Sequence, residues 1–139
     1  MITSNLKFPI LCFEHDFYPR IKQDWDSLTT TTKAGLKNGL FDNLLMVDSQ
    51  GMGIRVKNAK KLYGVGPFWG YNIFLNQRIK VELVFEGEPF HISVDEVRKY
   101  VLMSFERWHG WVTRGDFKEL VSSIHKAQSI REIIELLKG

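Results

Sequence analysis

Apolar residues recur at every second position in several stretches of the first two-thirds of the chain, which is the period of a β-strand. Phe8–Phe13 is apolar on both faces, and Pro9 favours an edge or a strand start because proline donates no ladder hydrogen bond. Asn43–Asp48 and Gly53–Leu62 flank a glycine-containing loop, which predicts an antiparallel hairpin with a basic outer face. Ile79–Phe85 shows the clearest strand alternation in the chain.

Turns and one short helix are expected between these strands. Phe17–Ile21 reads as a turn, because the proline within it fixes φ. Thr30–Asn38 predicts a short helix that a threonine caps and that Gly39 ends in the left-handed conformation. Gly87–Pro89 predicts a second turn, after which Phe90–Ile92 forms a short return strand.

The C-terminal third has the apolar spacing of amphipathic helices. Ser93–Glu96, Asp116–Glu119 and Ser129–Glu132 each place a capping side chain three residues before a glutamate, which is the pattern of a capping box. The order of elements predicts an α+β fold. We expect a mostly antiparallel twisted sheet of about four strands, one short N-terminal helix and about three C-terminal helices packed on one face of it.

The composition fits a single globular domain over residues 1–139. The apolar fraction is 44% and the charged fraction is 25%, both ordinary for a folded protein. Cys12 is the only cysteine, so no intramolecular disulfide can form, and a reducing, cytoplasmic location is expected. No stretch approaches the ~20 apolar residues that span a bilayer, so no membrane partner is expected.

Charge is segregated along the chain, although the formal net charge is only +3. No acidic residue lies between Asp48 and Glu82, and this stretch contains six lysines and arginines. In the following stretch, Glu82–Glu96, all five charged residues are acidic. The sequence therefore predicts one basic and one acidic region.

The loop Gly64–Gly70 is the most unusual segment. It resembles a phosphate-binding glycine loop, but it is one residue too long and lacks the following lysine and hydroxyl residue. Its glycines favour either aromatic rings presented as binding anchors or rings that fill one end of the sheet. The residues predicted to bind a partner, taken from this loop and the basic hairpin, are Lys57, Lys60, Lys61, Phe68, Trp69 and Tyr71.

Other polar residues form no recognisable catalytic or metal-binding pattern, so we expect no catalytic residue, no metal ion and no cofactor. Cys12 lies in an apolar run and is expected to behave as a small buried hydrophobe. An enzyme or small-ligand site would require Glu14, Asp16, His91 or His109 to converge in three dimensions.

The hairpin at 44–62, the aromatic loop and the capped helices from Ser93 onward are similar in layout to small bacterial immunity-type proteins of toxin–immunity systems. The resemblance covers most of the chain at the level of architecture and includes no diagnostic motif, so it assigns no binding residue. It implies a compact α+β domain that works by covering a partner's active site.

The leading hypothesis is a non-enzymatic protein-binding module, of which an immunity-type inhibitor of a bacterial toxin is a narrower form. The first alternative is nucleic-acid binding by the basic aromatic face of residues 55–80, since phosphates would meet lysines and bases would stack on rings. The second alternative is a small-ligand-binding protein or an enzyme.

Overall fold

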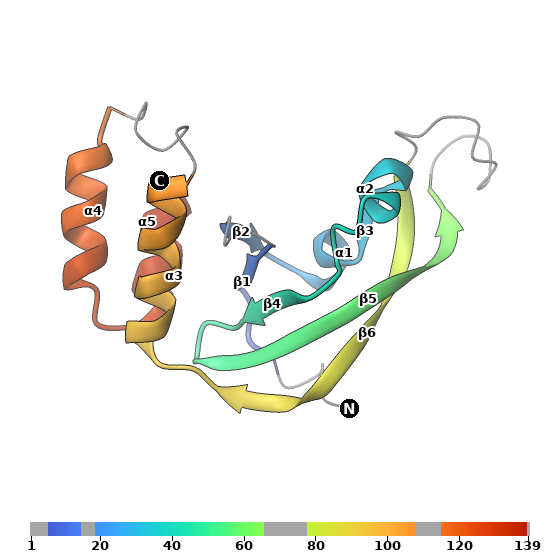
Figure 1. Cartoon of the computed structure of the whole chain (residues 1–139), viewed down its shortest axis with the longest axis horizontal. Helices are drawn as coiled ribbons and strands as arrows, with labels where there is room; N and C mark the ends of the chain where they lie inside the picture. The colour runs from blue at the N-terminus through green and yellow to red at the C-terminus, as the bar shows by residue number, and fades with distance from the viewer. Residues whose placement is uncertain (1–5, 15–18, 66–77, 108–114, 139) are drawn as a thin grey trace.

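A curled antiparallel sheet of six strands forms the centre of the computed structural model, which describes residues 6–14, 19–65, 78–107 and 115–138 (Figure 1). The strand order is β2-β1-β4-β5-β6-β3, and each neighbouring pair is antiparallel. The strands are β1 (Ile10–Phe13), β2 (Pro19–Lys22), β3 (Thr30–Thr32), β4 (Leu44–Val47), β5 (Met52–Gly64) and β6 (Arg78–His91).

Five helices within the described ranges accompany the sheet, and most helical residues are C-terminal. They are α1 (Trp25–Leu28), α2 (Lys33–Lys37), α3 (Val94–Arg107), α4 (Phe117–Lys126) and α5 (Ile130–Lys138). The predicted α+β class and antiparallel sheet are confirmed. The predicted strand number was wrong, because the sheet has six strands instead of about four.

Two of the missed elements lie where local patterns predicted something else. Pro19–Lys22 is strand β2, paired with β1, although Phe17–Ile21 was predicted as a turn. The β-branched residues of Thr30–Thr32 pair with β6 instead of starting a helix. Helix α2 begins only after them, and the Thr32 hydroxyl caps it by accepting a hydrogen bond from the Gly35 amide at 3.0 Å.

The predicted turn at Gly87–Pro89 was also wrong, because these residues form a bulge inside β6. Gly53 pairs with Phe90 and Arg55 pairs with Glu86, so three residues of β6 lie opposite one residue of β5. Gly87 has φ +75°, which is the left-handed conformation that a glycine adopts both in turns and in bulges. The strand therefore continues to His91.

Strands β1 and β4 are buried on both faces, as the apolar pattern of Phe8–Phe13 predicted for the first strand. Their odd-numbered residues face the C-terminal helices, and their even-numbered residues face the concave side of the curled sheet. The first set is Leu11, Phe13, Leu45 and Val47, and the second is Ile10, Cys12, Leu44 and Met46. One sheet thus separates two hydrophobic clusters.

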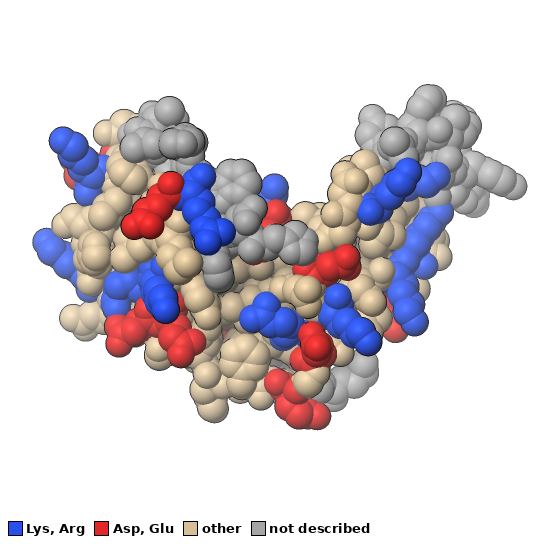
Figure 2. Space-filling model, viewed as in Figure 1, with Lys and Arg blue, Asp and Glu red and all other residues tan. Residues whose placement is uncertain are grey.

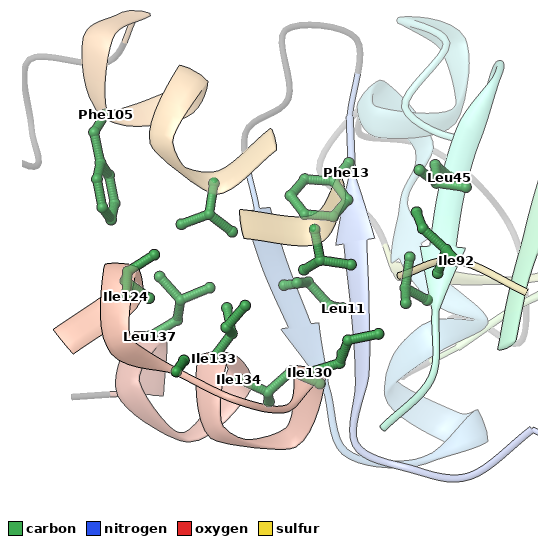
Figure 3. Close-up of a cluster of buried hydrophobic side chains, with 14 of the residues drawn as sticks. Leu11, Phe13, Leu45, Ile92, Phe105, Ile124, Ile130, Ile133, Ile134 and Leu137 are labelled. Atoms are coloured by element: carbon green, nitrogen blue, oxygen red, sulfur yellow. The ribbon is translucent and has the colours of Figure 1, made fainter. Parts of the chain in front are cut away.

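The first cluster joins the sheet to α3, α4 and α5, whose apolar side chains point toward β1 and β4 (Figure 3). Ile124, Ile133 and Ile134 are fully buried in it. The second cluster contains Leu28, Phe41 and the inward residues of the two long strands. The three predicted C-terminal helices therefore pack on one face, while the two short helices lie at the other.

Two of the three predicted helix starts have the expected cap. The Ser93 and Ser129 hydroxyls each accept a hydrogen bond from the glutamate amide three residues later, both at 3.1 Å. Asp116 makes no side-chain cap hydrogen bond, and its backbone is not in the extended conformation of a typical cap. Helix α1 has a full capping box between Asp24 and Ser27 that was not predicted.

A buried carboxylate, Asp48, organises the β4–β5 turn. Its Oδ1 accepts hydrogen bonds from the amides of Gln50 and Met52 at 2.9 and 2.8 Å, and its Oδ2 accepts one from the Lys7 amide at 3.0 Å. The residue is 2% exposed. Because Lys7 belongs to the segment before β1, this side chain ties the N-terminal segment to the hairpin.

Replacing Asp48 with alanine is expected to lower the free energy of unfolding by about 2–4 kcal/mol, since three part-buried hydrogen bonds from backbone amides are lost. Asp48→Asn should cost less, because one carbonyl oxygen remains. Urea denaturation measures the effect, with the exposed Glu119→Ala on α4 as control, which should stay within about 0.5 kcal/mol of the wild type. A loss for Asp48→Ala no larger than that of the control would contradict this role.

Candidate functional site

Strands β5 and β6 extend as a two-stranded ribbon beyond the rest of the sheet. Strand β4 pairs with β5 only over Gly53–Val56, and β3 pairs with β6 only over Arg78–Lys80. The register shifts at Lys57 and Leu62, as well as in β6, and such bulges bend and twist a ribbon. Figure 1 shows the ribbon sweeping away from the C-terminal helices.

The three lysines predicted to bind a partner are all exposed on this ribbon, but they do not share one basic face. Lys60 lies directly opposite Glu82, whereas Lys61 lies opposite Val81, whose side chain is buried in the second cluster. Directly opposed residues point to the same side of a sheet, so Lys60 and Lys61 point to opposite sides. Lys57 lies at a bulge between the two registers.

The acidic region of the sequence folds against the basic one. Arg55 lies opposite Glu86, just as Lys60 lies opposite Glu82, so the two regions of opposite charge are neighbouring strands. Figure 2 shows lysine and arginine side chains along the arm that contains the ribbon, with acidic side chains interspersed toward the middle of the view. Local pairing therefore reduces the net charge of the surface that the sequence predicted to be basic.

The end of the ribbon carries an apolar surface that the sequence pattern did not predict. Leu62 is 54% exposed and Tyr63 is 57% exposed, next to Lys60 and Lys61. The register shift between Lys61 and Tyr63 interrupts the alternation of side chains between the two faces of the strand. Odd or even position in the sequence therefore could not predict which face these side chains occupy. The predicted anchors Phe68, Trp69 and Tyr71 lie outside the described residues.

Phe90 is also exposed, but its position has a structural explanation. Its ring lies over Gly53, where an added Cβ would meet the ring at 2.8 Å. The absence of a side chain at Gly53 therefore makes room for the ring, and we do not include Phe90 in the candidate site.

The structure does not bring Glu14 and His91 together. Glu14 follows the end of β1 and pairs with Arg20 of β2, while His91 is exposed at the opposite end of the sheet, on β6. Asp16 and His109 lie outside the described residues. Within the described ranges, no group of three or more His, Cys, Asp or Glu side chains is arranged to hold a metal ion.

Cys12 is buried, as predicted, at the centre of β1. Burial raises the pKa of its thiol to about 12, because a thiolate would be poorly solvated there. Lys22 and Arg20 oppose this shift only in part. At neutral pH the side chain is a protonated thiol, which is a poor nucleophile.

Comparisons with known proteins give no family for this chain. No protein-family model matches it, and no curated protein or solved structure is significantly similar to it. Among the helices of the described residues, none combines the length and the apolar character needed to cross a bilayer.

The register of the ribbon can be tested by charge reversal. Lys60→Glu should destabilise the protein by about 0.5–1 kcal/mol by facing Glu82, and a second change, Glu82→Lys, should recover most of that loss. Lys61→Glu, which faces Val81, is the matched control and should gain little from Glu82→Lys. Equal coupling of both lysines to Glu82 in urea denaturation would contradict the register.

Proposed function

We propose that this chain is a non-enzymatic protein-binding module that uses the end of the β5–β6 ribbon. The observation that carries the proposal is the pair of exposed apolar side chains, Leu62 and Tyr63, on a strand that projects beyond its neighbours. Contiguous exposed apolar side chains are typical of interaction surfaces, and tyrosine is frequent among residues that dominate binding energy. Leu62 and Tyr63 are neighbours in the chain and are both more than half exposed.

The charged residues around Leu62 and Tyr63 indicate which kind of surface the partner would have. Lys60, Lys61 and Arg78 are exposed around Leu62 and Tyr63. Lys80 is already engaged, since its Nζ donates to Asp26 and to the Thr29 hydroxyl. A partner with an apolar contact surrounded by acidic residues would be complementary to this end, and the lysines would mainly accelerate its association.

An immunity-type inhibitor is the narrower form of this proposal. It is supported by the similarity of layout, which is a sheet with a protruding hairpin and helices on one face. In that form the ribbon end would cover the active site of a toxin.

Nucleic-acid binding by residues 55–80 has less support. Glu82 and Glu86 lie opposite Lys60 and Arg55, so the described part of that face alternates in charge. A phosphate backbone would meet carboxylates as well as lysines along the ribbon, and affinity for nucleic acid depends on an excess of cations.

Site-specific photocrosslinking tests the proposal in lysate of the source cell. A photoreactive amino acid at Leu62 should give one discrete protein adduct, and the same amino acid at the exposed Lys118 of α4 serves as the control. Leu62→Ser combined with Tyr63→Ser should lower recovery of that partner at least about tenfold, because the apolar anchors are lost.

Two results would overturn the protein-binding proposal. One is the same set of adducts from both positions, which would mean nonspecific contact. The other is an adduct at position 62 that nuclease removes and protease does not, which would favour the nucleic-acid alternative.

A further inference from the structure

A pocket opens between β2 and β3, the two edge strands of the sheet. Strands β2 and β3 end the sheet on its two sides, and the segment that contains α1 joins them across the concave face. The space between them has a volume of about 490 Å³. Pockets of this size are within the range that holds small organic ligands.

The floor of the pocket is apolar and belongs to the second hydrophobic cluster. It is made by Cys12 of β1, Leu44 of β4, Leu28 of α1 and Phe41. Each of these residues is at most 4% exposed. Because the raised pKa keeps the Cys12 thiol protonated, the floor has no charge at neutral pH.

The rim of the pocket is cationic. Arg20 and Lys22 of β2 line one side and Arg78 of β6 lines the other. Glu14 is the one carboxylate among the described lining residues. Glu14 is already paired with Arg20. No carboxylate of the described residues lies within ion-pair distance of Lys22 or Arg78. Within the described ranges, Lys22 and Arg78 therefore form no ion pair at the mouth.

Neighbouring acidic groups do not cancel this charge. Asp26 of α1 lies beside β3, and the hydrogen bond from Lys80 Nζ lowers the pKa of its carboxyl. Arg78 adds a smaller effect in the same direction, which shows that it lies near this carboxyl without pairing with it. Lys80 accordingly neutralises Asp26 and leaves Arg78 available.

Polar donors complete the site. Thr30–Thr32 line the pocket along β3, and the Thr32 hydroxyl, which accepts from the Gly35 amide, keeps its own proton for another acceptor. Strands β2 and β3 each pair with a strand on one side only, so main-chain groups on their outer edges have no strand partner. The pocket thus combines an uncharged apolar floor with donors and cations at its mouth.

We propose that this pocket binds a small organic anion, with its apolar body on the floor formed by Cys12, Leu28, Phe41 and Leu44, and its carboxylate or phosphate between Lys22 and Arg78. A purely polar anion would make no apolar contact with the floor, and a neutral apolar molecule would not pair with the two cations. The site shares Arg78 with the charged residues around the ribbon end, but its floor and Lys22 lie elsewhere. Binding of a small anion needs no protein partner, so this inference does not depend on the protein-binding proposal.

Four probes separate the contributions of charge and apolar contact. Titration calorimetry would compare octyl phosphate, octanoate, octan-1-ol and inorganic phosphate, each below its micelle concentration. Octyl phosphate and octanoate, each with eight carbon atoms, should bind at least about tenfold more tightly than either the alcohol or inorganic phosphate. Whichever of the two binds more tightly identifies the preferred head group. Hexanoate should bind more weakly than octanoate, by up to about fourfold per CH₂ removed.

The variant Lys22→Gln/Arg78→Gln locates the site. Arg78 is exposed and Lys22 is half-buried, and neither belongs to the hydrophobic clusters, so the fold should survive. Circular dichroism checks this. Its affinity for octyl phosphate and octanoate should fall at least about tenfold, whereas octan-1-ol should be unaffected. The control variant Lys99→Gln/Lys118→Gln removes the same net charge from exposed positions of α3 and α4 and should bind both anions as the wild type does.

Three results would overturn the proposal. They are equal affinity for octan-1-ol and these anions, equal losses in the two double variants, and binding of inorganic phosphate as tight as that of octyl phosphate. The first would show that charge is irrelevant, the second that only net charge matters, and the third that the apolar floor plays no part.

Discussion

The burial of β1 and β4 on both faces is the constraint on which the rest of the structure depends. A strand that is covered on both sides must satisfy its main chain within the sheet and needs apolar residues at consecutive positions. Leu11 and Cys12 show the consequence, since neighbouring residues enter different hydrophobic clusters. The helices cover one face, so the other must be covered by the curl of the sheet and by the segment around α1.

The curl in turn creates both candidate sites. Bulges bend the β5–β6 ribbon and leave Leu62 and Tyr63 exposed at its end. The same curvature brings β2 and β3 to the two sides of one pocket, although they lie at opposite edges of the sheet. The apolar floor of that pocket is part of the second cluster, so the interaction that stabilises the centre also shapes the site.

The elements that were predictable from sequence are those specified by their own residues. Alternation in Ile79–Phe85 and the caps at Ser93 and Ser129 act locally, and both gave the right element. Strand β3 and the bulge at Gly87 depend on pairing with neighbouring strands. From sequence alone, the residues of β3 were therefore predicted to start a helix, and those of the bulge to form a turn. The exposure of the lysines was predictable, but their distribution over two faces and the pocket between distant residues were not, since both follow from register and curl.

Native-state hydrogen exchange tests most directly whether the two-sided burial of β1 and β4 organises the fold. Amides of residues 10–13 and 44–47 that are bonded within the sheet should exchange only when the whole protein unfolds, with the free energy found by urea denaturation. Those at 58–63 and 82–86 in the ribbon should exchange at least about tenfold faster, through local opening. Ribbon amides protected as strongly as those of β1 and β4, or central amides that exchange before the ribbon opens, would contradict the account.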